Sequence, residues 1–497
     1  MIGNLLKAGL AGALALVAVV LAPLGAAAKD GDAARLVGAM LGETPIISDL
    51  RQLTDTIGGR VTGTPANAAA VEWGLAKFRA AGIAAEKEAF TMPGLWVGEG
   101  TSVRISGAAS FAPRAVARAF SAATTGNGLA APLVDGGFGT DADFARLGAS
   151  AKGAWVLLET VALTDARGLG GLFESYMTDT AAERRAKAAG VAGIVFMSSR
   201  PQNLLYRYVS TFSYANTLPI IMIEREGAKR ALRTLRAGNP LRLSARVNAR
   251  RGPAYTAYNV IGEIRGAEKP DEIVLVGAHL DSWALGTGAL DNGANISLVI
   301  DMARQIKGLG LRPRRTIRFA LFNGEEQSIQ GSWGYVIRHA AELDRHVLAS
   351  AYDIGSGRIN GYFTNGRPEL GPIVDRLLKP VAGLGPFTQV DDVIIGTDNF
   401  DFMLNGVVNL VGNQESANYP SNYHSRADTF DKVDQRQLKL NSAIAAALTY
   451  GFADSDIRLP RQTPAEVRAY VDKPVPRGEM AAFGYLADWN SGKRGRH

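Results

Sequence analysis

The chain has 497 residues, of which 47% are hydrophobic and 20% charged, a balance that is typical of globular proteins and excludes a largely disordered one. Its net charge of +7 is scattered, without a long basic stretch, which argues against nucleic-acid binding. The chain contains no cysteine, so disulfides and cysteine chemistry are excluded and any metal site must use histidine, aspartate and glutamate.

Residues 1–28 have the pattern of a secretory signal. Lys7 supplies a short positive start, residues 8–24 are apolar, and three alanines at 26–28 offer a cleavage site. The alternative is a retained membrane anchor, but the apolar run is short for a membrane span and its small-residue end favours cleavage. We therefore expect an exported protein, periplasmic or secreted, without a stable membrane anchor after cleavage.

The mature chain is predicted to begin with a helix and two strands. Apolar residues at helical spacing predict the helix over 67–81, which ends before Gly82. The segments 86–91 and 100–105 have the residue pattern of strands.

Residues 126–248 change in character and are predicted to form a compact β-rich unit. A helix is expected at 180–189, and strands at 130–137, 154–159, 192–197 and 218–223. This segment has no cluster of histidine, aspartate and glutamate with metal-ligand spacing. We therefore expect it to serve a steric or recognition role.

From residue 254 onward, strands and helices alternate. The expected helices are 293–307, 327–339 and 435–451, and the expected strands are 259–264, 273–278, 316–322, 347–352 and 407–411. This alternation predicts an α/β fold with a mostly parallel central sheet flanked by helices. Residues 29–125 and 249–497 are therefore expected to form one catalytic domain, interrupted by the 126–248 insert.

Residues that can bind a metal follow successive strands of this second half. They are His279, Asp281, Asp291, Glu325, Glu326, Asp353 and His424. Because ligand groups in an open α/β sheet sit past the carboxyl ends of the strands, we expect these side chains to converge. Crowded carboxylates raise one another's pKa, and a multivalent cation removes that penalty. Five ligands suffice for two zinc ions that share one carboxylate.

The chemistry also calls for residues that are not ligands. Two zinc ions can hold a hydroxide and polarise a carbonyl, and a free carboxylate must then carry the proton from the water to the leaving amine. One member of the Glu325–Glu326 pair can bind metal while the other acts as this base. Asp281 is placed to hydrogen-bond the far nitrogen of His279 and so fix the ring.

These motifs together resemble the M28 family of zinc metallopeptidases. The matching segments are AHLDSW at 278–283, GALD at 288–291, GEE at 324–326, Asp353 and YHS at 423–425. Within the family, the chain is most similar to the carboxypeptidase Q branch, in which a protease-associated domain is inserted into the catalytic domain. The resemblance covers nearly the whole mature chain, and it implies that residues 126–248 are that inserted domain.

The resemblance also implies a role for each motif residue. Asp291 would bridge two zinc ions, His279 and Asp353 would complete one site, and Glu326 and His424 the other. Glu325 would be the general base.

Other positions are assigned by the same comparison. Asp398, in a loop at 396–400, and Tyr423 are candidates for substrate binding. Asn292 is a departure, because the family often has a second acid after the bridging aspartate. The three remaining histidines have no motif partner and are expected to be structural or exposed: His339, His346 and His497.

Three functions remain in competition. The first is an exported dinuclear zinc exopeptidase that cleaves short peptides or dipeptides. Whether it acts at the amino or the carboxy end stays open, because the first would need a carboxylate in the pocket and the second an arginine or lysine. The second is a glutaminyl cyclase-like aminoacyl transferase with one zinc, and the third is a non-catalytic binding relative. The complete ligand set and base favour the first, and a homodimer is an open alternative to a monomer.

Overall fold

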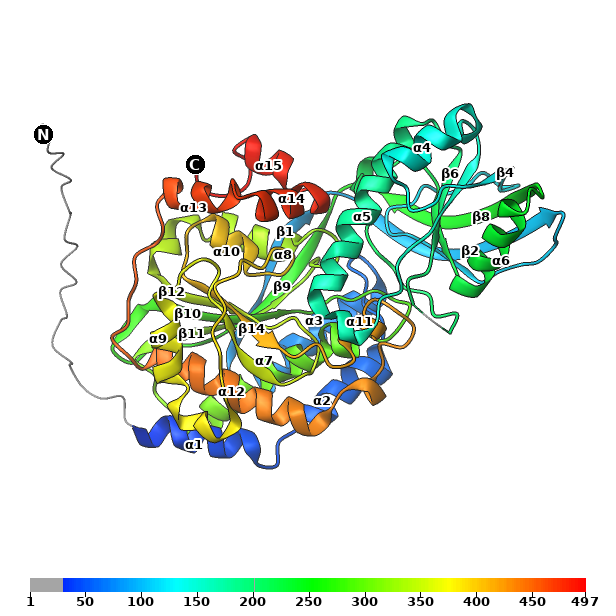
Figure 1. Cartoon of the computed structure of the whole chain (residues 1–497). Coiled ribbons are helices and arrows are strands. Elements are labelled where there is room, and N and C mark those ends of the chain that lie inside the picture. The colour runs from blue at the N-terminus through cyan, green and yellow to red at the C-terminus, as the bar shows by residue number, and fades with distance from the viewer. Residues whose placement is uncertain (1–29, 201) are drawn as a thin grey trace, which may run out of the picture.

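The computed structural model describes residues 30–200 and 202–497, which form two units, each built on a seven-stranded sheet (Figure 1). The predicted secretory signal, residues 1–28, lies outside the described residues. Within the described ranges, no helix is long and apolar enough to cross a membrane.

The first unit contains a mixed sheet with the strand order β1-β9-β11-β10-β12-β14-β13. Its strands are β1 (Ala84–Met92), β9 (Tyr255–Ile264), β10 (Lys269–His279), β11 (Arg315–Phe322), β12 (His346–Ala351), β13 (Ile359–Phe363) and β14 (Asn409–Gln414). Only the four central strands, β11, β10, β12 and β14, are parallel to one another. The prediction of a mostly parallel sheet is therefore corrected to a mixed sheet, because β1, β9 and β13 are added at its edges by antiparallel pairing, which needs no crossover helix.

Helices cover both faces of this sheet (Figure 1). One face packs against α3 (Pro65–Ala80), α7 (Ala294–Gly308) and α12 (Gln435–Ala453), and α1 (Asp30–Leu41) and α2 (Ile46–Arg51) pack on the outer side of α12 and α7. On the other side lie α8 (Gln330–Arg338), α10 (Phe400–Leu404) and the C-terminal helices α13 (Pro464–Val471), α14 (Pro474–Phe483) and α15 (Leu486–Asn490). Two further helices, α9 (Leu370–Leu377) and α11 (Tyr419–Asn422), lie in connections.

The sequence explains where the longest of these helices lie. In α7, the apolar residues at helical spacing are all buried, namely Ile296, Val299, Ile300, Ala303 and Ile306. Helix α12 begins after Asp434, whose side chain accepts a hydrogen bond from the backbone N–H of Gln437 at 2.9 Å. Helix α7 therefore forms where its hydrophobic period places it, without a side-chain cap, whereas α12 begins at a capping residue.

The second unit has the strand order β2-β8-β4-β5-β6-β7-β3. Its strands are β2 (Leu95–Gly107), β3 (Ala115–Ala117), β4 (Leu129–Asp135), β5 (Trp155–Leu158), β6 (Gly193–Met197), β7 (Ile220–Ile223) and β8 (Leu241–Gly252). Three helices accompany them: α4 (Asp141–Leu147), α5 (Gly168–Ala188) and α6 (Arg225–Arg236). Strands β2 and β3 precede residue 126, so the second sheet takes two of its strands from before the predicted start of the insert, since a strand pattern does not reveal its pairing partner.

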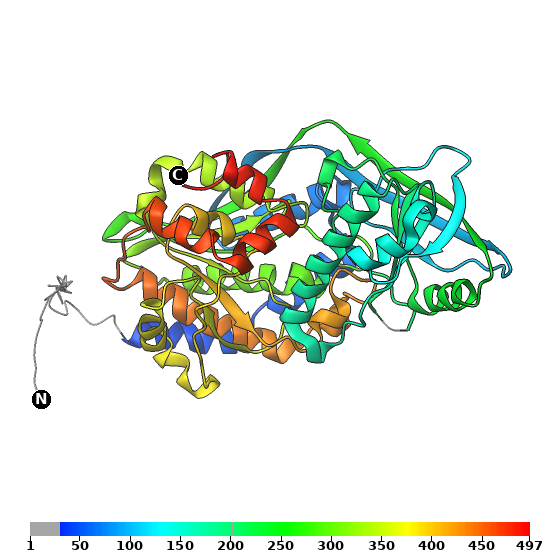
Figure 2. The ribbon, with the colours of Figure 1, turned by 45° about the horizontal axis from the view of Figure 1, so that its top comes forward.

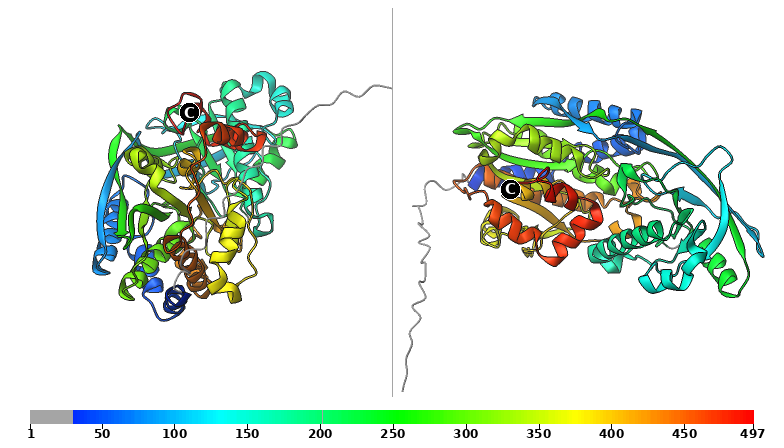
Figure 3. Two further views of the ribbon diagram at one scale, coloured as in Figure 1. Left: turned by 90° about the vertical axis from the view of Figure 1, so that its left-hand side faces the viewer. Right: turned by 90° about the horizontal axis from the view of Figure 1, so that it is seen from above.

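Two adjacent strand connections join the units. Strand β1 continues into β2, and β8 continues into β9, as the long two-stranded ribbon in Figures 2 and 3 shows. The pairing is kept on both sides of the crossing, with Met92 opposite Tyr255 and Leu95 opposite Gly252. Helix α5 of the second unit also packs against α14, where the Arg184 guanidinium donates to the Ala481 carbonyl at 2.7 Å.

Candidate metal centre

Four neighbouring parallel strands bring the potential ligands to one edge of the first sheet. Strand β10 ends at His279, and the connections after β11, β12 and β14 carry the Glu325–Glu326 pair, Asp353 and His424. Because these strands lie side by side, their carboxyl ends deliver the side chains to a common place. Asp291 reaches the same place from the loop that precedes α7.

The predicted ligands form two groups of three that share Asp291. In the first group, His279 Nε2 lies 3.1 Å from Asp291 Oδ1 and 2.9 Å from Asp353 Oδ1. In the second, His424 Nε2 lies 3.1 Å from Asp291 Oδ2 and 2.8 Å from Glu326 Oε2. Within each group, the atoms that could bind a metal lie within 4.8 Å of one another.

The donor set and its electrostatics fit a pair of divalent cations. Burial raises the pKa of Glu326 to about 7, and its Oε1 has no hydrogen-bond partner among the described residues. Burial lowers the pKa of His424, but Glu326 and Asp291 together raise it to about 9. Without a bound cation, protons would therefore compensate the negative charge of the crowded carboxylates. Imidazole and carboxylate donors in two groups of three, with one carboxylate shared, suit zinc.

The second ring nitrogen of each ligating histidine is held by a backbone carbonyl. His279 Nδ1 donates to the carbonyl of Asp281 at 3.1 Å, and His424 Nδ1 donates to the carbonyl of Arg207 at 2.7 Å. A carbonyl oxygen can only accept, so Nδ1 carries the hydrogen and Nε2 is left to bind a metal.

The sequence predicted that the Asp281 carboxylate orients His279, but the structure shows a different arrangement. The nearest carboxylate oxygen, Oδ1, lies 3.8 Å from His279 Nδ1, beyond hydrogen-bond distance. Instead, Oδ1 accepts the backbone N–H of Glu325 at 3.2 Å and Oδ2 accepts that of Glu326 at 3.3 Å. Asp281 thus fixes the Glu325–Glu326 turn, and its backbone fixes the imidazole.

Two charged residues that the sequence did not single out hold the loop before α7. The buried guanidinium of Arg60 donates to four backbone carbonyls, those of Gly58, Leu280, Thr287 and Gly288. The Asp428 carboxylate accepts the backbone N–H groups of Ala289, Leu290 and Asp291. Both side chains bind backbone groups, which every sequence offers, so neither residue could be singled out from the sequence.

Asn292, the departure from the family pattern, supports the neighbouring ligand. Its amide donates to Asp353 Oδ1 at 2.9 Å and to the Tyr352 carbonyl at 2.8 Å. The Asp291–Asn292 peptide bond is cis. An amide at this position donates to Asp353, whereas a second carboxylate would repel it.

Two acids near the ligands belong to neither group. Burial raises the pKa of Glu325 more than His279 lowers it, and the pKa lies well above its usual value. Asp398 is only 2% exposed, and neither of its carboxylate oxygens has a hydrogen-bond partner among the described residues. Burial raises the pKa of Asp398 to about 8, with His279 and the nearby Ser332 hydroxyl opposing the rise and Asp353 adding to it.

Tyr423 packs directly on His424, one of the predicted ligands. Its ring stacks on that of His424, with 3.6 Å between ring centroids, and its hydroxyl lies 3.4 Å from the Tyr176 hydroxyl of α5. These contacts make Tyr423 part of the wall behind the ligand. Its predicted role in substrate binding stays a prediction.

The other histidines lie outside both groups of ligands. His339 Nε2 lies 3.0 Å from Glu88, His346 Nε2 lies 2.9 Å from the Tyr335 hydroxyl, and His497 Nε2 lies 3.1 Å from the Arg494 carbonyl. These contacts are explained by a structural role for each of the three histidines.

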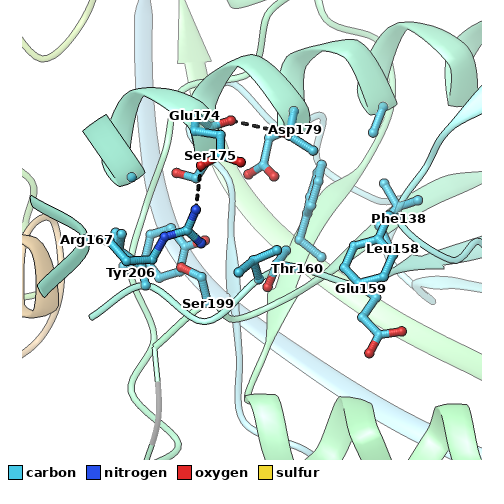
Figure 4. Close-up of a pocket in the computed structure, with 16 residues that line it drawn as sticks. Phe138, Leu158, Glu159, Thr160, Arg167, Glu174, Ser175, Asp179, Ser199 and Tyr206 are labelled. Atoms are coloured by element: carbon cyan, nitrogen blue, oxygen red, sulfur yellow. Dashed lines mark hydrogen bonds and ion pairs between the residues drawn. The ribbon is translucent and has the colours of Figure 1, made fainter. Parts of the chain in front are cut away.

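A separate pocket lies in the second unit, beside α5 (Figure 4). Its charged side chains already have partners: Arg167 pairs with Glu174, Asp179 with Arg118, and Glu159 with Arg236. No group of potential metal ligands lies in this pocket among the described residues. The chemistry is therefore concentrated at the edge of the first sheet.

Comparison with known proteins agrees with the motif reading. Residues 259–449 match the model of peptidase family M28. Carboxypeptidase Q of Bos taurus is 31% identical over 244 residues, which are 49% of this chain and 52% of that protein, so the match spans about half the length of that relative. Aminopeptidase YwaD of Bacillus subtilis is 28% identical over 81% of this chain and 83% of its own length.

A solved structure extends the likeness to most of the chain. The crystal structure of a peptidase M28 precursor from Shewanella amazonensis superimposes with a TM-score of 0.81 and 27% identity, covering 88% of this chain and 99% of that one. The predicted resemblance to M28 peptidases is thereby confirmed.

Proposed function

Because residues 259–449 carry a peptidase family M28 domain, we propose that the chain is a zinc-dependent exopeptidase that hydrolyses short peptides. The observation that carries the proposal is the pair of three-residue groups that share Asp291 at the carboxyl edge of the sheet. Two zinc ions would be held by these residues, one by His279 and Asp353 and the other by Glu326 and His424, with Asp291 shared by both groups. When bound, they would lower the pKa of a water molecule and polarise the peptide carbonyl.

Glu325 is the proposed general base. It lies next to a ligand but belongs to neither group, and Asp281 holds its backbone N–H. Burial holds the pKa of its carboxylate above the usual range, which is the direction that a base working near neutral pH requires. The side chain takes a proton from water and returns it to the leaving amine.

Asp398 supports cleavage at the amino end. A buried carboxylate without a hydrogen-bond partner is costly unless something else satisfies it. A free α-ammonium group supplies both the positive charge and the donors that Asp398 lacks. The relatives do not decide between the two ends, because YwaD is named an aminopeptidase and carboxypeptidase Q a carboxypeptidase, so the choice rests on Asp398. The proposed substrates are therefore dipeptides and short peptides with a free amino terminus.

Export and domain organisation are also part of the proposed function. We infer that residues 1–28 direct export to the periplasm or the exterior. The second unit, residues 95–252, is proposed to be an inserted protease-associated domain.

The proposal is tested by metal analysis together with substrate selection. We expect about two zinc ions per chain, and hydrolysis that is lost on chelation and restored by zinc. A free dipeptide should be cleaved, its N-acetylated form should not, and its C-terminal amide should be cleaved nearly as well. Cleavage of the acetylated form but not the amide would reverse the end assignment, and a metal-free active protein would refute the mechanism.

A further inference from the structure

The second unit contacts one metal ligand directly. Arg207, in the connection between β6 and β7, donates its backbone N–H to the His424 carbonyl at 3.0 Å. In return, His424 Nδ1 donates to the Arg207 carbonyl at 2.7 Å. Tyr206 and Ser425 form an antiparallel bridge next to this pair. A short backbone bridge from the second unit therefore holds the ring of His424.

The ring of His279 is held by a residue of the first unit instead. His279 Nδ1 bonds to the carbonyl of Asp281, two residues further along the same loop. That loop belongs to the first unit, where Arg60 fixes it through the Leu280 carbonyl at 2.7 Å. The two groups of ligands thus differ in what orients the histidine ring, because the Nδ1 partner of His279 is a carbonyl of the first unit and that of His424 is a carbonyl of the second.

The bridge supports an unfavourable backbone conformation at His424. His424 has a φ of 57°, in the left-handed region that residues other than glycine rarely occupy. Such a conformation costs free energy and persists when neighbouring contacts impose it. The two hydrogen bonds to Arg207 act on this same residue, one at its backbone and one at its ring.

The Arg207 segment is itself anchored in the second unit. The Arg207 side chain is buried, and its Nε donates to the Ala117 carbonyl of β3 at 3.2 Å. Its guanidinium lies 5.2 Å from the ring of Trp96 in β2 and also contacts the first unit, 5.6 Å from the ring of Trp283. Tyr208, the next residue, stacks on Tyr176 of α5 with 4.0 Å between ring centroids. The position of the bridge is therefore set by the second unit.

We propose that the second unit sets the metal affinity of the group formed by His424, Glu326 and Asp291, whereas the His279 group binds metal independently of it. The reasoning rests on the metal centre proposed above. Loss of the bridge would free the ring of His424 to rotate and to place its hydrogen on Nε2, which cannot then bind metal. Arg207 is a positioning residue, and the affinity at this one site should fall by about 10–100-fold when it is disturbed.

The test compares two arginine variants of the full-length protein. Arg207→Ala removes the anchor of the bridge, and Arg207→Pro removes the backbone N–H that binds the His424 carbonyl. Arg184→Ala is the matched control, because Arg184 also links the units, through Ala481, but does not touch His424. Metal-free protein is titrated with Zn²⁺ and with Co²⁺ against a chromogenic chelator, and both dissociation constants are measured.

The expected result is site-selective. Both Arg207 variants should keep one site at wild-type affinity, which also shows that they are folded, and weaken the other about 10–100-fold. Arg184→Ala should leave both sites unchanged. His424→Ala should lose the same site, and adding Arg207→Ala to it should cause no further loss.

The outcomes separate this inference from the proposed function. Two unchanged sites in the Arg207 variants, or two sites weakened alike, would overturn the inference while leaving a dinuclear peptidase intact. A wild-type protein that binds fewer than two metal ions would instead overturn the metal centre on which the inference rests.

Discussion

The exchange Glu325→Gln separates the proposed base from the neighbouring ligand. The hydrogen bonds made at position 325 are backbone ones, to Asp281 Oδ1 and from the N–H of Ile329, so an amide of the same size leaves the turn intact. Glu325 belongs to neither ligand group, so zinc should stay at about two ions per chain. Loss of proton transfer should lower kcat by about 10²–10⁴-fold, which corresponds to about 2.7–5.5 kcal/mol of barrier.

The assay measures zinc content and kcat on one free dipeptide for two matched variants. Glu326→Gln is the control, because Glu326 Oε2 lies 2.8 Å from His424 Nε2 within a ligand group, and this variant should lose zinc from one site. If Glu325→Gln loses zinc while Glu326→Gln keeps it, the two roles have been exchanged. If Glu325→Gln keeps its zinc and more than a tenth of its activity, Glu325 is not the base.

Three further predictions concern other residues. Asp398→Asn should raise KM for dipeptides with a free amino end by about 10–100-fold, since a hydrogen bond to a charged group contributes about 1.5–3 kcal/mol, and steady-state kinetics against an unchanged zinc content checks this. Burial lowers the pKa of His346 to about 4, so between pH 4 and 6.5 the unfolded chain binds the extra proton. Stability should therefore be full above pH 6.5 and fall by up to about 3 kcal/mol towards pH 4, and urea unfolding should show a flatter profile for His346→Gln; an identical profile would count against this account. Arg494→Ala should cost about 3–5 kcal/mol in urea unfolding, because it leaves the buried Asp401 carboxylate without its two hydrogen bonds, and Arg494→Met with Asp401→Leu should recover most of the loss.

The ligand set could be predicted because its signal is local. A buried parallel strand reveals itself by a run of apolar residues, and the residue after it must lie at the carboxyl edge of the sheet. His279 and Asp353 were found in this way. The rule needs no knowledge of which strands are neighbours, since all the parallel strands end at the same edge.

The features that escaped prediction depend on contacts between distant parts of the chain. Strand β2 pairs with β8, more than a hundred residues away, so its strand pattern could not assign it to the second sheet. Asp281 stands two residues after His279, but its carboxylate accepts the backbone N–H groups of Glu325 and Glu326, which follow the neighbouring strand β11. The partners of Arg60, Asp428 and Arg207 are backbone groups, and a backbone group leaves no trace in a sequence.

The two strand connections between the units lie side by side, so the inserted segment could be removed by protein engineering. Because Met92 faces Tyr255 in the same register that places Leu95 opposite Gly252, entry and exit of the 93–254 segment lie at adjacent points. A two-residue turn could close the β1–β9 hairpin at that point without shifting any strand of the first sheet. Recombination could thus have added or removed the segment as a cassette, and an engineer could exchange it for another.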